Sequence, residues 1–153
     1  MHLKAFEKLG INIEKNYGNI VCKCDKITGE KIDLEFPSVG ATENAMLASV
    51  LAEGKTQITN AAREPEIIDL QNFLNKMGAK IKGAGTSKIE IQGVKKLKDV
   101  SHNIMPDRIE TGTFLCLAAI NKGNIIVKNA DSTHITPIID KLEEIGCQFN
   151  INK

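Results

Sequence analysis

The sequence is poor in aromatic residues and has no tryptophan. Its 153 residues include five phenylalanines and one tyrosine, and 20 basic residues face 19 acidic ones, for a formal net charge of +1. Proteins that bind single-stranded nucleic acid combine a basic groove with aromatic stacking platforms, and anionic membranes attract a basic surface. These absences argue against an RNA-binding α/β repeat and predict that neither nucleic acid nor a membrane is a partner.

Long apolar runs are also absent. No stretch approaches the roughly 18 apolar residues of a membrane-spanning helix. The first residues, Met1–Lys4, lead into a helical pattern rather than into a signal peptide. A cytoplasmic location is therefore expected.

Cysteine and histidine show no spacing that is typical of a reactive or metal-binding site. No C-x-x-C, H-E-x-x-H or zinc-ligand pattern can be drawn from Cys22, Cys24, Cys116 and Cys147 or from His2, His102 and His134. The sequence therefore predicts reduced thiols, no metal site, no cofactor and no catalytic group composed within this chain.

An internal repeat is the most informative feature that is present. Helical patterns end in an apolar residue followed by glycine at Gly10, Gly78 and Gly146, which are 68 residues apart each time. Glycine is favoured just after a helix because that position is left-handed. A short strand is predicted after each of these glycines, at residues 11–13, 79–82 and 147–151.

A second helix recurs at an offset of 69 residues, predicted at 41–53 and 110–122. Each is followed by a β-rich run that ends in Asn-Ala, at Asn60 and Asn129. Alternating stretches at 19–24, 32–36 and 88–92 predict strands that are covered on one face. The very apolar residues 114–120 predict a helix buried behind a sheet.

The predicted fold is α/β (α+β), with repeated βαβαββ-type units. The third unit stops after its first helix and strand, whereas repeat arrays normally complete or cap their last unit. We therefore expect the chain to be a piece of a longer protein. Cutting through a repeat exposes faces meant for neighbours, so a homodimer through these faces is also expected.

Three helix starts carry candidate binding residues. Ser38, Val39 and Gly40 precede one helix, where backbone N–H groups and a hydroxyl could meet an anionic or sugar ligand, although simple capping would use the same residues. Arg63, Glu64 and Glu66 surround Pro65 at another, and a cation there is unfavourable unless it serves an anion or an ion pair.

Charges also surround the start of the third helix. Asp107 is a plausible N-cap, and Arg108 and Glu110 follow it beside an apolar run. Charges in such surroundings must be paired with one another or directed at a polar ligand. Both interpretations, an internal charge cluster and a ligand site, stay open on these grounds. Gly83–Lys88 lacks phosphate-loop spacing and predicts a hairpin turn.

Five segments together resemble the UDP-N-acetylglucosamine 1-carboxyvinyltransferase family. They are Pro37–Thr42, Leu51–Gly54, Asn60–Ile67, Leu74–Ile81 and Pro106–Thr113, in the order and spacing of that family from near residue 1 to near residue 150. The segments AAREPEI and PDRIETGTF are the most specific. The resemblance implies the inside-out α/β barrel, present here incompletely, that the family shares with the shikimate-pathway enolpyruvyl transferase.

The resemblance also implies a function. The family transfers the enolpyruvyl group of phosphoenolpyruvate to the 3-hydroxyl of UDP-N-acetylglucosamine, in peptidoglycan synthesis, with the ligands between two domains. Residues 1–105 would belong to the first domain and 106–153 to the second. Ser38, Val39 and Gly40 resemble the loop that contacts the uridine diphosphate, with Phe36 in place of a frequent lysine.

The same resemblance assigns supporting roles to the charged residues and no catalytic residue to this chain. Arg63, Glu64, Glu66, Asp107, Arg108 and Glu110 resemble charges that line the cleft and help it close. The family's reactive cysteine, its phosphoenolpyruvate ligands and its base correspond to segments outside residues 1–153. An inactive piece of the transferase is therefore expected, and the alternative is a stand-alone, non-catalytic binding or interaction module.

Overall fold

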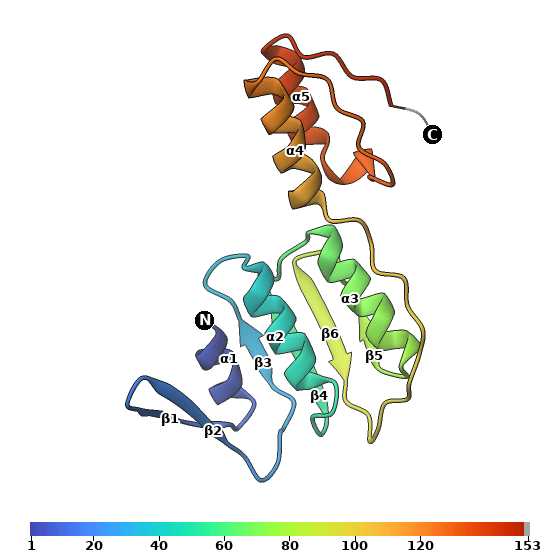
Figure 1. Ribbon diagram of the computed structural model, residues 1–153. Helices are drawn as coiled ribbons and strands as arrows, with labels where there is room; N and C mark the ends of the chain where they lie inside the picture. Colours follow the sequence, from blue (N-terminus) through green and yellow to red (C-terminus); the bar gives the residue numbers. More distant parts are fainter. Residues whose placement is uncertain (152–153) are drawn as a thin grey trace. The chain divides into compact units, whose positions relative to one another are not determined.

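The computed structural model describes residues 1–151, which fall into two compact units, Met1–Asn103 (unit 1) and Ile104 onward (unit 2). Figure 1 labels the elements. In unit 1 they are α1 (His2–Lys8), β1 (Asn12–Asn16), β2 (Asn19–Lys23), β3 (Lys31–Asp33), α2 (Val39–Ser49), β4 (Lys55–Thr59), α3 (Pro65–Lys76), β5 (Lys80–Lys82) and β6 (Lys88–Gln92). Unit 2 holds α4 (Arg108–Ile120), a 3₁₀ turn (Ser132–His134) and α5 (Thr136–Glu144).

A four-stranded sheet forms the framework of unit 1. Its strand order is β3-β4-β6-β5, in which β3 runs parallel to β4 while β6 is antiparallel to both of its neighbours. The succession β3-α2-β4-α3-β5-β6 is the βαβαββ unit that the sequence predicts. A separate hairpin pairs β1 with β2 through Tyr17 and Gly18, whose positive φ values of 47° and 80° suit a tight two-residue turn.

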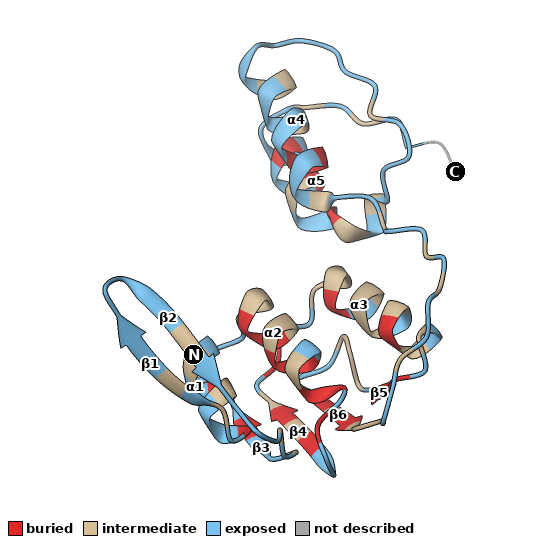
Figure 2. Ribbon diagram, turned by 60° about the horizontal axis from the view of Figure 1, so that its bottom comes forward, coloured by how far each residue is buried: buried red, intermediate tan, exposed pale blue. Residues whose placement is uncertain are grey.

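The hydrophobic core of unit 1 lies between this sheet and its helices. Alternate strand residues point inward, so that Ile58, Ile89 and Ile91 are at most 1% exposed. They belong to one buried cluster with Met46 of α2 and Ile67 of α3. Burying each such side chain contributes roughly 1.5–3 kcal/mol. Figure 2 shows the buried residues along the sheet and the helix faces of unit 1.

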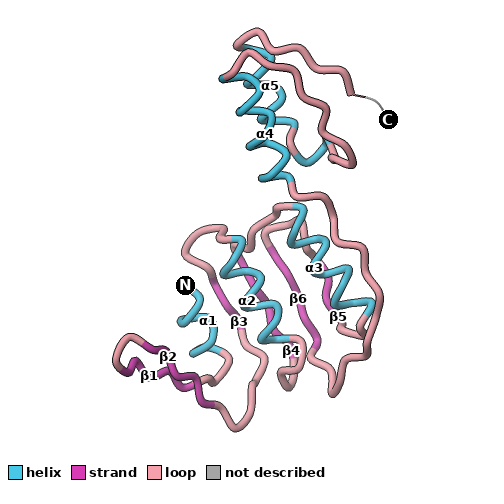
Figure 3. The backbone as a smooth tube through the Cα atoms, viewed as in Figure 1, coloured by secondary structure: helices cyan, strands magenta, loops and turns pink. Residues whose placement is uncertain are grey.

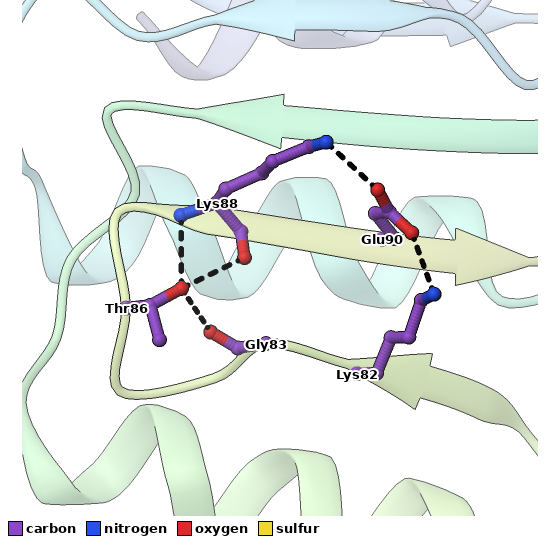
Figure 4. Close-up of polar contacts among 5 residues, drawn as sticks. All are labelled: Lys82, Gly83, Thr86, Lys88 and Glu90. Atoms are coloured by element: carbon purple, nitrogen blue, oxygen red, sulfur yellow. Dashed lines mark hydrogen bonds and ion pairs between the residues drawn. The ribbon is translucent and has the colours of Figure 1, made fainter.

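The opposite face of the sheet is polar. Glu90 of β6 forms ion pairs with Lys82, whose Nζ lies 2.9 Å away, and with Lys88, whose Nζ lies 2.8 Å away (Figure 4). Hydrogen bonds from Lys88 and then Lys82, followed by their charges, lower the pKa of Glu90 from 4.5 to about 2. Glu90 therefore links β6 to the neighbouring strand β5 on the solvent side.

The predicted hairpin turn at 83–88 is confirmed. Gly83 takes a positive φ of 95°, and Thr86 Oγ1 donates to the Gly83 carbonyl at 2.8 Å and accepts from the Lys88 amide at 3.2 Å (Figure 4). The segment leads from β5 into β6. Its glycines serve a turn rather than a phosphate.

The glycines that mark the repeat also behave as predicted. Gly10, Gly78 and Gly146 all have positive φ, at 87°, 103° and 97°, and each follows the C-cap residue of its helix, α1, α3 or α5. The strand after each glycine is confirmed in the first two cases, as β1 and β5. The recurring helices are confirmed as α2 and α4, although both begin two residues earlier than predicted and end before the predicted boundary.

Three predictions fail in unit 2. Residues 124–128 and 147–151 form no strand, and the α4 residues predicted to be buried are open, with Phe114 43%, Leu117 52% and Ile120 80% exposed. Figure 3 shows helices and loops alone in the described part of unit 2. A strand needs a neighbour for its backbone groups, and a helix face needs a sheet to cover it. A sequence pattern does not show whether the neighbouring strand or the covering sheet is present.

Gly93 offers a test of how tightly β6 is joined to the end of α2. Its amide donates to the Gly54 carbonyl at 3.0 Å, and a Cβ on Gly93 would lie 1.6 Å from the Ala52 carbonyl oxygen. We expect Gly93→Ala to lower the free energy of unfolding by roughly 3 kcal/mol. Gly78→Ala, where only φ is strained, should cost roughly 1 kcal/mol. Urea unfolding followed by circular dichroism measures both, and an equal cost would contradict this account.

The pKa of Glu90 gives a pH prediction. Because the folded-state pKa is below the unfolded value, the charged carboxylate stabilises the fold above pH 4.5, and this contribution is lost as the pH falls toward 2. Glu90→Gln should therefore be less stable than the wild type at neutral pH, and the difference should shrink in acid. Urea titrations at the two pH values, with Glu7→Gln as a surface control, measure it. A difference that does not change with pH would refute the assignment.

Candidate functional site

The helix N-termini of unit 1 meet at one edge. Figure 1 shows α2 and α3 starting at the same end of the sheet. The Ala62 amide, just before α3, donates to Oγ1 of Thr42, in the first turn of α2, at 3.0 Å. Thr42 and Ala62 are both fully buried. This bond brings two of the three predicted segments, 38–40 and 63–66, to a single edge.

The segment 38–40 is held by capping. Ser38 has extended φ and ψ, and its Oγ accepts from the Ala41 amide at 3.3 Å, so it is the N-cap of α2. The backbone amides of Val39 and Gly40 lie in the first turn of α2, where a helix has no carbonyl of its own to accept their hydrogen bonds. His2 lies against this turn, because a Cβ on Gly40 would be 3.3 Å from its Cε1 atom. Phe36, two residues before the cap, is 58% exposed.

The segment 63–66 opens α3. Pro65 is the first helical residue, as predicted, and Glu64 stands before it as the N-cap residue without a side-chain cap bond. Glu64 Oε2 instead accepts from the Arg63 amide at 2.8 Å. The Asn60 side chain donates to the Leu34 carbonyl at 3.0 Å and fixes the loop before this segment to the end of β3. Arg63 is exposed at the edge.

Glu43 adds an acid that sequence reasoning did not select. It lies one residue after Thr42 on α2, and burial, followed by the nearby charge of Glu66, raises its pKa. A cation or a hydrogen-bond donor from a ligand would find two carboxylates here, while the helix N-termini favour an anion. The edge therefore presents both signs of charge beside free backbone amides.

The third predicted segment belongs to unit 2. Asp107 is the N-cap of α4, and its Oδ1 accepts from the amides of Ile109 at 2.7 Å and Glu110 at 3.1 Å. Asp107 is thus the N-cap of this helix, as the sequence predicts. Asp107 and Glu110 also line a hollow of about 610 Å³, whose other wall is formed by residues 125–129.

No sequence motif includes His102, and the structure places it in a cluster of side chains. Its side chain is 8% exposed, its Nε2 lies 3.0 Å from Asp69 Oδ1, and its Nδ1 lies 3.2 Å from Lys76 Nζ. Its ring centroid is 5.4 Å from that of Phe73. The three partners lie along one stripe of α3, which the spacing 69, 73 and 76 could have indicated, but no sequence signal linked that stripe to residue 102.

Other features of the described residues carry no composed site. Residues 1–151 contain no group of three or more histidine, cysteine or acidic side chains that could hold a metal, and no helix long and apolar enough to cross a membrane. All four cysteines are free thiols. A hollow of about 760 Å³ lies on the polar face of the sheet, and no predicted site residue lines it.

The family model for EPSP synthase (3-phosphoshikimate 1-carboxyvinyltransferase) matches residues 1–153. A UDP-N-acetylglucosamine 1-carboxyvinyltransferase 2 from Caldanaerobacter subterraneus is 57% identical over 149 residues, which are 97% of this chain and 36% of that protein. Another, from Carboxydothermus hydrogenoformans, is 56% identical over 97% of this chain and 35% of its own length. The chain thus spans about a third of the relatives that it matches.

Two solved structures share the fold. The enolpyruvyl transferase NikO from Streptomyces tendae superposes with a TM-score of 0.79 at 21% identity, over 98% of this chain and 39% of its own. An EPSP synthase from Acinetobacter baumannii gives a TM-score of 0.66 at 23% identity, over 94% and 33%. These likenesses confirm the predicted fold class, with an incomplete set of units. The chain therefore belongs to the EPSP synthase (3-phosphoshikimate 1-carboxyvinyltransferase) family, and it is similar in sequence to the UDP-N-acetylglucosamine 1-carboxyvinyltransferases named above.

Proposed function

We propose that this chain provides the sugar-nucleotide side of a UDP-N-acetylglucosamine enolpyruvyl transferase. The observation that carries the proposal is the edge of unit 1 where Ser38, Val39 and Gly40 lie beside Arg63, Glu64 and Glu66, tied by the bond between Ala62 and Thr42. Amides at a helix N-terminus suit a diphosphate, because they donate hydrogen bonds and carry partial positive charge. Ser38, Val39 and Gly40 would contact the uridine diphosphate.

The charged residues have supporting roles in this proposal. Arg63, Glu64 and Glu66, and likewise Asp107, Arg108 and Glu110, would be charges that line the ligand cleft of the complete enzyme and help to order it. Unit 1 would correspond to part of the first family domain and unit 2 to the beginning of the second. Phe36 offers no cation to the nucleotide, so the diphosphate would depend on backbone donors.

The isolated chain would perform no enolpyruvyl transfer. The reaction forms a bond between the sugar 3-hydroxyl oxygen and C2 of phosphoenolpyruvate, removes the hydroxyl proton and releases inorganic phosphate. By resemblance, the reactive cysteine, the base and the phosphoenolpyruvate ligands lie on family segments outside this chain. The complete enzyme would act in the cytoplasm in peptidoglycan and cell-wall synthesis, and so in cell shape and the cell cycle, without a cofactor or metal.

Self-association is a second proposal, favoured by the apolar surface of α4, where Phe114, Leu117 and Ile120 are exposed. Such a surface in water favours association with a partner. A homodimer through exposed repeat faces would cover it. A stand-alone interaction module would use the same surface. The UDP-N-acetylglucosamine titration described below distinguishes such a module from a piece of the transferase, because only the latter is expected to bind the sugar nucleotide.

Binding and turnover test the proposal together. With phosphoenolpyruvate and UDP-N-acetylglucosamine supplied, we expect no phosphate release by the isolated chain in a coupled assay. In NMR titration with UDP-N-acetylglucosamine alone, we expect weak binding with shifts at the amides of residues 38–40 and 63–66. Sustained phosphate release would contradict the inactivity, and shifts confined to other residues would contradict the site.

A variant at Ser38 separates ligand contact from capping. Aspartate is as good an N-cap as serine, so Ser38→Asp should leave the free energy of unfolding nearly unchanged. Its charge opposes a diphosphate, so the affinity for UDP-N-acetylglucosamine should fall about tenfold or more. Ser101→Asp, which adds the same charge to an exposed loop, is the matched control. Equal affinities of the two variants for UDP-N-acetylglucosamine would contradict a diphosphate-binding site at this edge.

A further inference from the structure

The segment that follows β6 is attached to the rest of unit 1 at several points. Residues 94–102, the strap, run back beside α3 toward α4 (Figure 1). The Val94 amide donates to the Val50 carbonyl at 2.9 Å, and farther along the Lys98 amide donates to the Met77 carbonyl, also at 2.9 Å. Because Val50 and Met77 are the C-cap residues of α2 and α3, these two bonds fix the strap to the ends of both helices.

The last attachment of the strap is the ring of His102. Its side chain is 8% exposed and lies between Asp69 and Lys76, two side chains of α3. An ammonium group has only donors, so Lys76 Nζ donates to Nδ1, and Nε2 must carry the proton that is donated to the Asp69 carboxylate. The ring is therefore the Nε2–H tautomer, in which each nitrogen has a partner.

Beyond this ring the attachments stop. Residues 103–106 make no backbone–backbone hydrogen bond within the described chain, and Ile104, the first residue of unit 2, is 82% exposed. Freedom ends again at Pro106, which fixes its own φ and restricts the residue before it, and Asp107 then caps α4. The connection between the two units is therefore free only at residues 103–105.

We propose that His102 is a positioning residue that confines the hinge between the two units to residues 103–105. Without its two side-chain bonds, the last attachment of the strap is the Lys98 amide, and the hinge begins at residue 99. The free connection then more than doubles in length. The effective concentration of one unit at the other falls roughly threefold, because it varies as about the −3/2 power of that length. This inference does not depend on the proposed function.

Backbone ¹⁵N relaxation of the full chain tests the position of the hinge. In the wild type, order parameters should stay near about 0.85 through the strap and drop below about 0.6 only at residues 103–105. His102→Phe keeps a ring against Phe73 but removes both bonds, so its low order parameters should extend back to residue 99. The amides of β6 should keep their chemical shifts, which shows that unit 1 is still folded.

Two further variants separate the bonds from the packing. His102→Gln keeps a donor for Asp69 and an acceptor for Lys76, so it should restore the wild-type profile. Ser101→Ala, at the adjacent exposed position, is the matched control and should leave the profile unchanged. Ordered residues 99–102 in His102→Phe, or equal profiles of the Phe and Gln variants, would show that the two bonds do not set the hinge.

The tautomer gives a test that needs no change at residue 102. A long-range ¹H–¹⁵N correlation spectrum of the imidazole should show the proton on Nε2 and a bare Nδ1. Lys76→Met removes the donor to Nδ1, so both tautomers should then be populated. A proton on Nδ1 in the wild type, or a wild-type hinge that already reaches into the strap, would overturn the inference.

Discussion

The pairing of β4 with a neighbour on each side is the constraint on which unit 1 depends. With β3 parallel on one edge and β6 antiparallel on the other, every second residue of β4 is directed beneath the helices. Ile58 then packs in the same cluster as residues of α2 and α3, and the helix N-termini are brought to one edge of the sheet. The bond from Ala62 to Thr42 is made at that edge. The proposed ligand contacts are a consequence of this arrangement.

Local features of this fold could be predicted from sequence because their causes are local. A glycine is needed where the chain leaves a helix with positive φ, so Gly10, Gly78 and Gly146 marked helix ends correctly. Pro65 and Asp107 fit the first turn and the N-cap for reasons that involve only their nearest neighbours. The alternation of Lys88–Gln92 was sufficient to place β6 at its observed bounds.

Features that depend on distant partners could not be predicted in the same way. Residues 124–128 have the pattern of a strand, but a strand exists only when its backbone groups find acceptors and donors. His102 gave no signal, because its partners are on α3, more than 25 residues away in sequence. Each of the site segments 38–40 and 63–66 could be recognised from its own sequence. That they lie at one edge could not be predicted, because the hydrogen bond from Ala62 to Thr42 that joins them is a tertiary contact.

The central claim is that the same repeated segment forms a strand only where neighbouring strands pair with it, as at residues 55–59 but not at residues 124–128. Hydrogen exchange of the chain in dilute solution, where copies are apart, measures this most directly. The account predicts strong protection of the amides of residues 55–59 and exchange of those of 124–128 at nearly the rate of an unfolded chain. Equal protection of the two segments in dilute solution would contradict it.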